Sequence, residues 1–528
     1  MAKKLLAVLL AALMVVCITG CGGPKEVWVS EEVIVGGNNT DRTARTSKGD
    51  GDTSATTALS GSATRPPKSN DELIDFTPVT DASANYNVKG EVSIAVDTVR
   101  PTDYEALFDI MQKLYPNIKF TFDYWTHQSN DDAREYLNTR MKTKTAANII
   151  WDEAGMIPTY LYNGWIKPIT KYVEKDSEAK NIPANLKSDY TFGGQLFAVP
   201  HQATFEVVVF NTDLMGKINM GMPKLDWSLA DYEDCLKKAG NSFNKGTAVA
   251  VEDQDGVGDR IAFYLAAKDG KSVGTNAYNY KGQCFETTYL KKGYLQLRAY
   301  RLLPGVEAWY QEQQTTGGVD LLQQNLGVAN YYDCWRSGKA LLENCGSWIV
   351  ETTMKNQKNF SWKMWTTPNV KGKMMMHVDH CFITSTTPDN RMDACYQALR
   401  FMSFSTNGNL ARLTMYEDSQ KGKYNLNSHI YYPTTSSADV IKKYNALSCT
   451  NEVDEYLVKN IPNSSRTDTF KLVYAIQDTY DIWISKMNDI TDGLDTSGDG
   501  LNEPVAKANK EVKENLAAFD KAFKKNYK

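Results

Sequence analysis

Segments with strand character alternate with segments of helix character along most of this chain. Val92–Val96 and Ile118–Tyr124 are apolar stretches of strand length, and Asp103–Leu114 and Ala133–Thr143 carry apolar residues at the spacing of one helix face. Strands that alternate with helices form parallel sheets with helices on both faces. The sequence therefore predicts an α/β fold. We expect further strands at 149–151, 196–199, 207–210, 262–265 and 380–384, and a charged amphipathic helix at 505–525.

Length and charge narrow the class of protein. A chain of 528 residues is long enough for two or three domains with sizeable cores. The formal charge is −4 and the basic residues form no stripe, which argues against a nucleic-acid partner. We expect a monomer.

The N-terminus has the layout of an export signal. Lys3 and Lys4 precede the apolar run Leu5–Val16, which is shorter than the roughly 20 residues needed to span a bilayer. The next residues, Ile18-Thr19-Gly20-Cys21, resemble a bacterial lipobox, in which cleavage precedes the cysteine and its sulfur carries lipid. The resemblance predicts a signal peptide at 1–20 and a lipid anchor at Cys21, which holds the protein to the extracellular face of the cell membrane. The alternative is an ordinary signal peptide that contains a cysteine.

A polar segment follows the proposed anchor. From Gly22 to about Asn85 the chain is rich in Gly, Ser, Thr, Asp and Asn and poor in large apolar residues. Such a segment cannot bury enough apolar surface to fold alone. We therefore expect a flexible tether over residues 21–87.

Several short sequence segments then occur in an order that is typical of one protein family. They are found at 115–120 (YPNIKF), 147–153 (ANIIWDE), 193–200 (GGQLFAVP), 210–214 (FNTDL), 226–228 (DWS) and 337–348 (SGKALLENCGSW). The series resembles the extracellular solute-binding lipoproteins of ABC importers, especially the carbohydrate-binding group that includes maltose-binding protein, and it covers about residues 90–440. The sequence departs from the family at Ala147-Asn148, where Pro-Asp is common, and at Thr212, where Lys is usual.

The resemblance implies a two-lobed fold of the periplasmic-binding-protein type (type II), in which each lobe has a mainly parallel sheet flanked by helices. The lobes would be joined by a hinge, and the ligand would lie in the cleft between them. We expect residues 88–205 and 346–387 in the first lobe, and residues 206–345 and 388–528 in the second.

Candidate ligand residues follow three predicted strands of the first lobe. Sugar rings have apolar C–H faces, which aromatic rings cover, and hydroxyl pairs, which carboxylates and amides can hydrogen-bond. Those residue types occur after the strands as Asp97 and Thr98, as Trp125, and as Trp151, Asp152 and Glu153. For each, the alternative is an ordinary role in packing or in capping a turn.

Further candidates lie near the predicted hinge and in the second lobe. His201, Gln202 and Glu206 fall on the first crossing between the lobes, and Trp348 resembles a family tryptophan near the second crossing. Trp309 would provide a stacking platform in the second lobe, although helix packing explains it equally well.

An acidic loop near the C-terminus is the main candidate for a metal site. Asp495, Ser497 and Asp499 occupy alternate positions of a loop that resembles the start of a calcium-binding EF loop. Position 12 of that loop is Ala506, so Glu503 would have to substitute for the missing glutamate, and a solvated turn is the alternative to a structural calcium ion. The sequence His377–Cys381 is explained better as a buried strand near the hinge than as a metal site. We expect no other cofactor.

The favoured function is a transport receptor that captures a carbohydrate, an oligosaccharide in our expectation, and delivers it to an ABC permease. No nucleophile elbow, P-loop or zinc motif indicates an enzyme. The alternatives are an exported carbohydrate-active enzyme, an adhesin or sensor without a transporter, and a binder of peptides or other small solutes.

Overall fold

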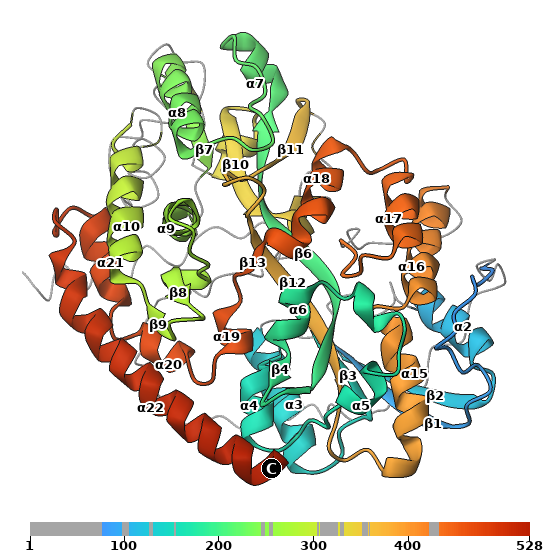
Figure 1. Cartoon of the computed structure of the whole chain (residues 1–528). Helices are drawn as coiled ribbons and strands as arrows, with labels where there is room; N and C mark the ends of the chain where they lie inside the picture. Colours follow the sequence, from blue (N-terminus) through green and yellow to red (C-terminus); the bar gives the residue numbers. More distant parts are fainter. Residues whose placement is uncertain are drawn as a thin grey trace, which may run out of the picture. The chain divides into compact units, whose positions relative to one another are not determined.

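The part of the chain that the structure describes is built of strands connected by helices, as Figure 1 shows. The structure is a computed structural model, and it describes residues 76–97, 105–125, 130–152, 155–243, 249–252, 257–303, 306, 326–327, 332–350, 357, 359–421 and 432–528. The strands are β1 Gly90–Asp97, β2 Ile118–Trp125, β3 Ile149–Asp152, β4 Thr191–Phe192, β5 Gln195–Leu196, β6 Ala198–Asn211, β7 Val249–Glu252, β8 Tyr278–Asn279, β9 Cys284–Phe285, β10 Ala340–Gly346, β11 Trp362–Thr366, β12 Met375–Ile383 and β13 Ser465–Arg466.

The helices range from a single turn to seven turns. They are α2 Glu105–Leu114, α3 Asn130–Lys142, α4 Ile157–Tyr162, α5 Thr170–Val173, α6 Ala184–Asp189, α7 Thr212–Lys217, α8 Leu229–Phe243, α9 Val257–Lys268, α10 Thr287–Arg301, α13 Tyr332–Arg336, α14 Ser347–Ile349, α15 Met392–Met402, α16 Thr406–Gln420, α17 Ala438–Asn445, α18 Glu452–Asn460, α19 Thr469–Leu472, α20 Gln477–Tyr480, α21 Ile484–Thr491 and α22 Asn502–Tyr527. Short 3-10 turns include η3 Thr275–Ala277, η6 Ile461–Asn463 and η7 Asp499–Leu501.

The main sheet has the strand order β2-β1-β3-β12-β6-β10-β7, with β11 also paired to β6 and β13 to β12. β1 pairs in parallel with both β2 and β3, whereas β12 runs antiparallel to β3 and to β6. The sheet is therefore mixed and flanked by helices, which agrees with the predicted α/β class.

The long strand β6 belongs to two parts of this sheet. Its residues 198–205 pair with β12, and its residues 206–211 pair with β10 and β11. The change of partner falls between Phe205, which lies opposite Met376, and Glu206, which lies opposite Gly346. Side chains near this point can therefore meet residues from both parts of the sheet.

The strand pairing and helix packing can be compared with the predicted boundaries of the two lobes. β11, which the prediction assigned to the first lobe, pairs with residues of β6 assigned to the second. α15, assigned to the second lobe, packs against β1 and β12. The lobe boundaries stay a prediction.

Most predicted elements are confirmed, with two differences. The strands expected at 196–199 and 207–210 lie largely within the single strand β6. The strand expected at 262–265 is wrong, because those residues lie inside helix α9. A short, fully buried apolar run fits a strand and a buried helix equally well. α9 is buried because it packs closely on α10, where a Cβ on Gly293 would lie 2.7 Å from the carbonyl oxygen of Gly258.

Helix α22 lies along two separate parts of the fold, as the red helix in Figure 1 shows. It contacts α4 near one end and β9 and η7 near the other. The Asn509 side chain pairs with both backbone groups of Phe285, and Asn526 donates to the carbonyl oxygen of Tyr162. The predicted helix at 505–525 is therefore confirmed, and it packs on the body. None of the described helices combines the length and the apolar character that crossing a membrane requires.

The residues just before β1 are docked on α15 and α16. Arg400 donates to the Asp81 carboxylate at 2.7 and 3.1 Å, and the same guanidinium contacts Asp176 and Glu178. The Asn407 side chain bonds both backbone groups of Val79. Residues 76–87, which we expected to belong to the flexible tether, are thus held by specific contacts.

Candidate functional site

The carboxyl ends of three strands meet at one edge of the sheet. β1, β2 and β3 end at Asp97, Trp125 and Asp152, and Asp97 lies opposite Trp125 in the β1–β2 register. β12 places His380 opposite Asp152. Three predicted ligand residues, Thr98, Glu153 and Trp309, lie outside the described residues, and only the backbone is described for Asp97, Trp125 and Asp152.

A network of buried charged side chains lies next to this edge of the sheet, at the point where β6 changes its pairing partner. Glu206 Oε1 lies 2.8 Å from His377 Nε2, and the other ring nitrogen, Nδ1, lies 2.6 Å from Asp468 Oδ1. Arg260 of α9 also pairs with Glu206. The imidazole on β12 therefore bridges a carboxylate on β6 and the carboxylate of Asp468, which lies just before α19.

The network extends to Gln202, another predicted residue. Gln202 Nε2 donates to Asp379 Oδ2 at 2.8 Å, and Lys471 Nζ donates to Asp379 Oδ1 at 2.8 Å. Lys471 also lies 3.5 Å from Asp468. The predicted residues Gln202 and Glu206 are thus connected through residues that come from β12 and α19.

A second arginine completes the network. Arg466 Nη1 donates to the Tyr190 hydroxyl at 2.8 Å, and Nη2 donates to the carbonyl oxygen of Val378 at 2.9 Å. Its guanidinium lies 3.7 Å from Asp189 and 3.9 Å from Asp468.

These contacts set the protonation states. Burial alone would lower the pKa of His377, but Asp468 and Glu206 outweigh it and raise that pKa to about 9. Burial opposes ionisation of Glu206 and Asp468, yet neighbouring cations hold the pKa of each carboxyl below its usual value. Near neutral pH, His377 is therefore a cation and each of its ring nitrogens donates to a carboxylate.

Charges in the network are balanced. The cations are Arg260, His377, Lys471 and Arg466, and the carboxylates around them are Glu206, Asp379, Asp468 and Asp189. Burial raises the pKa of Asp189 to about 6, so this group is mostly ionised at pH 7. Four positive groups thus face four negative ones among these residues. The buried carboxyl of Asp259 also interacts with Arg260 and Glu206, and burial raises its pKa to about 7.

Trp348 lies beside this network. Its indole meets the His377 ring edge to face, with centroids 4.9 Å apart and planes at 82°. A Cβ on Gly346 would come within 2.2 Å of the indole, so the ring lies directly over that glycine. The buried indole N–H makes no hydrogen bond with any described residue. Trp348 therefore adds an aromatic surface and a hydrogen-bond donor to the polar group.

Trp151 has a different position. Its side chain is fully buried, and it meets Phe108 and His201 in edge-to-face contacts with centroids 5.6 and 4.6 Å apart. His201 is also fully buried, and burial lowers the pKa of its imidazole well below the usual value. The structure thus gives Trp151 and His201 packing contacts, and their role in ligand binding stays a prediction.

The predicted calcium loop is closed by its own hydrogen bonds. The Asp495 carboxylate accepts backbone N–H groups of Ser497, Gly498 and Gly500 at 2.8 to 3.1 Å, and Asp499 pairs with Lys291. Glu503 lies exposed on the first turn of α22. Among the described residues, no three His, Cys, Asp or Glu side chains gather as metal ligands. The calcium site stays a prediction.

Sequence reasoning missed most of the network. Arg260, Asp468 and Lys471 come from α9 and from the segment after β13, far from the predicted hinge in the chain. His377 and Asp379 were noted only as members of a buried strand. Their alternation on that strand was the one available signal, because it places both on the same face.

Several solved structures share the fold of this chain. A sugar transporter from Rhizobium etli in an open conformation superposes with a TM-score of 0.59 at 16% identity, over 80% of this chain and 99% of that one. A substrate-binding protein from Listeria monocytogenes in complex with cycloalternan gives 0.55 at 14% identity, with coverages of 80% and 99%. A cyclic α-maltosyl-1,6-maltose binding protein from Arthrobacter globiformis gives 0.55 at 12%, with the same coverages. The fold is therefore that of the periplasmic binding proteins.

The sequence itself assigns the family. The chain belongs to the bacterial extracellular solute-binding proteins, whose family model matches residues 106–420. These are binding proteins rather than enzymes, so the expected absence of an enzymatic activity agrees with the family. A search of the curated proteins finds no matching sequence.

Proposed function

We propose that this protein captures a neutral carbohydrate, an oligosaccharide in our expectation, between its lobes and delivers it to an ABC permease. The observation that carries the proposal is the balanced network around His377, beside Trp348. A buried network that pairs its own charges offers no free charge to an ionic ligand, and an unpaired charge is costly to bury. Neutral hydroxyl groups can share the remaining hydrogen-bonding capacity of carboxylates, amides and indole N–H groups.

The ligands named for two of the structural neighbours support a carbohydrate as the ligand. The Listeria protein is described in complex with cycloalternan, and the Arthrobacter protein binds a cyclic maltosyl-maltose. On the present chain, Trp348, Gln202 and Glu206 are the candidates for ligand contact that belong to the network or lie beside it. Asp97, Thr98, Trp125, Trp151, Asp152, Glu153, His201 and Trp309 complete the proposed site.

We further propose that Cys21 anchors the protein by lipid to the outer face of the cell membrane. Replacing Cys21 by Ala should release the protein into the medium. Cys17→Ala is the matched control, because Cys17 lies just before the lipobox-like residues Ile18–Cys21 and should leave retention unchanged. Membrane retention of the Cys21→Ala protein would contradict the anchor.

The proposed ligand class is tested by thermal unfolding with a panel of solutes. The protein should begin before Phe76, so that the contacts of Asp81 are retained. A ligand at 100 times its dissociation constant stabilises the native state by about 2.7 kcal/mol, which is readily measured as a melting shift. We expect neutral oligosaccharides to give the shift. A shift with only charged sugars, amino acids or peptides would overturn the proposed ligand class.

A further inference from the structure

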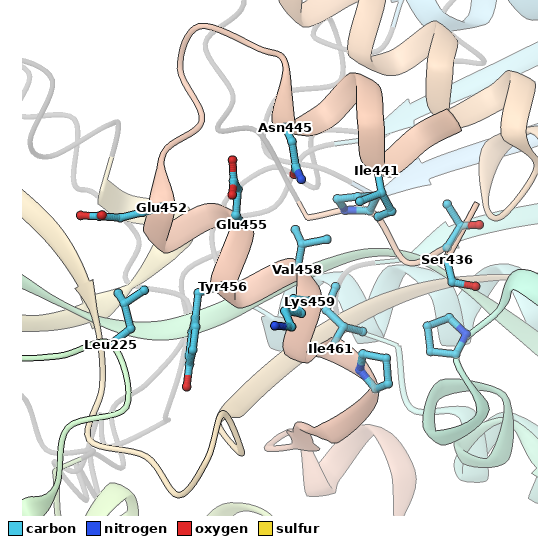
Figure 2. A pocket seen from close by; sticks show the side chains of 14 residues that line it. Leu225, Ser436, Ile441, Asn445, Glu452, Glu455, Tyr456, Val458, Lys459 and Ile461 are labelled. Carbon is cyan, nitrogen blue, oxygen red and sulfur yellow. The ribbon is translucent and has the colours of Figure 1, made fainter. Parts of the chain in front are cut away.

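A pocket distinct from the network opens between helices α17 and α18. Its volume is about 530 Å³, which lies within the range of roughly 300–1,000 Å³ typical of small-molecule sites. Figure 2 shows its lining, to which none of the network residues contributes. The walls are largely apolar and come from Pro183, Leu225, Pro433, Ile441, Val458, Ile461 and Pro462.

One face of α18 provides most of the remaining lining. Glu452, Glu455, Tyr456 and Lys459 have the i, i+3, i+4, i+7 spacing of a single helix face. A capping box between Asn451 and Asp454 fixes the start of this helix. The face is therefore presented by a well-defined helix.

Tyr456 is held in place as an aromatic wall. Its hydroxyl donates to Asn369 Oδ1 at 3.3 Å, and the Asn369 amide donates to the carbonyl oxygen of Leu225 at 2.8 Å. Leu225 itself lines the pocket. The ring is thus positioned before any ligand arrives, which lowers the entropic cost of binding.

Two polar groups with unused capacity line the pocket on the other side of α18 from this ring, as Figure 2 shows. Glu455 on α18 and Asn445 on α17 line the pocket in Figure 2, and neither side chain makes a hydrogen bond within the described part of the chain. Glu452 is paired with Lys363 at 2.7 Å, and Lys459 also lines the pocket. The pocket therefore combines an aromatic face, a carboxylate and an amide.

We propose that this pocket is a second binding site that takes one ring of a neutral saccharide. The C–H face of the ring would pack on Tyr456, and adjacent hydroxyl groups would bond Glu455 and Asn445. The identity of the ligand rests on the proposed function, whereas the existence of a second site does not. The ring could belong to a separate sugar molecule. It could also belong to a longer chain that occupies the strand-edge site as well, which is the proposed site at the ends of β1, β2 and β3 beside the His377 network.

The test is a calorimetric titration of the mature protein with maltohexaose, xylohexaose and the corresponding disaccharides. We expect two binding events with at least one of these sugars. Tyr456→Ala should weaken one event about tenfold, as expected for the loss of one buried aromatic contact. Tyr456→Phe keeps the ring but loses its hydrogen bond to Asn369, so it should weaken that event less than Tyr456→Ala does. Trp348→Ala should weaken the other event.

The outcomes separate the two proposals. A single event that Trp348→Ala weakens and Tyr456→Ala leaves unchanged would overturn the second site and support the proposed function. A Tyr456-dependent event with disaccharides identifies a separate molecule, and one with hexasaccharides alone identifies a longer chain. If the melting temperature shows that Tyr456→Ala is misfolded, Glu455→Gln replaces it, because this exposed side chain can change without loss of packing. Binding of none of these sugars would overturn the saccharide ligand proposed for both sites.

Discussion

The His377 imidazole lies 2.8 Å from the Glu206 carboxylate, at the residue where β6 leaves one part of the sheet for the other. This contact connects β12 to the point at which β6 changes partner. Because Asp468 holds the opposite ring nitrogen, the imidazole is bound on both sides. The protonation state of His377 therefore affects its contacts with both Glu206 and Asp468.

The stability of the protein should depend on pH through His377. Its pKa is raised from 6.5 to about 9 in the folded state, so the stabilisation is fully present below pH 6.5 and is lost as the pH rises through 9. Melting temperatures between pH 6 and 10 should show this loss, and His377→Gln should flatten the curve in that range. An unchanged curve for the variant would assign the pH dependence to other groups.

The buried arginine on α15 should be essential for stability. Arg400→Leu leaves Asp81, Asp176 and Glu178 together without their cation, and breaking a buried ion pair in this way costs about 3–5 kcal/mol. Arg391→Leu is the matched control, because its pair with Glu91 is exposed and should contribute no more than about 1 kcal/mol. Chemical denaturation measures both. Equal effects would show that burial of the Arg400 cluster is unimportant.

The contact between α9 and α10 should not accept a larger residue. A methyl group at Gly293 would lie 2.7 Å from the backbone oxygen of Gly258, so the helices would have to separate. We expect Gly293→Ala to lower the free energy of unfolding by about 1–3 kcal/mol. Gly221→Ala, where nothing lies within 4 Å of the added group, should change it far less. Similar values for the two variants would contradict the close contact.

Substitution of Gly346 should test Trp348 without removing it. An added Cβ would lie 2.2 Å from the indole, so Gly346→Ala must displace the ring from its contact with His377. We expect altered tryptophan fluorescence and weaker binding of the ligand found in the solute panel. Trp348→Ala should weaken binding by about 1–3 kcal/mol if the ring is a central contact. Unaltered affinity in both folded variants would remove Trp348 from the site.

The sequence was informative where structure depends on local pattern. Alternating apolar segments predicted β1, β2 and β3, and parallel strands necessarily place their carboxyl ends at one edge. The ionic network could not be predicted in this way. Glu206 and His377 are 171 residues apart and His377 and Asp468 are 91 apart, and no periodicity connects residues at such separations.

Trp151 shows a second limit of sequence reasoning. An aromatic residue at the end of a strand looks the same in sequence whether its ring faces a ligand or another element. Here α2 supplies Phe108 against the ring, and the side chain is fully buried. Likewise, the polar composition before β1 did not reveal that Asp81 meets an arginine more than 300 residues away.

The docking of residues 76–87 has a mechanical consequence. A pull on the chain from its N-terminal side meets the contacts of Val79 with Asn407 and of Asp81 with Arg400 before it reaches β1. β1 lies between β2 and β3, so force applied directly to β1 would act on the hydrogen bonds that join these three strands. The contacts of Val79 with Asn407 bear that load first and the ion pairs of Arg400 bear it next, so both sets of contacts shield the sheet from tension on the N-terminal segment.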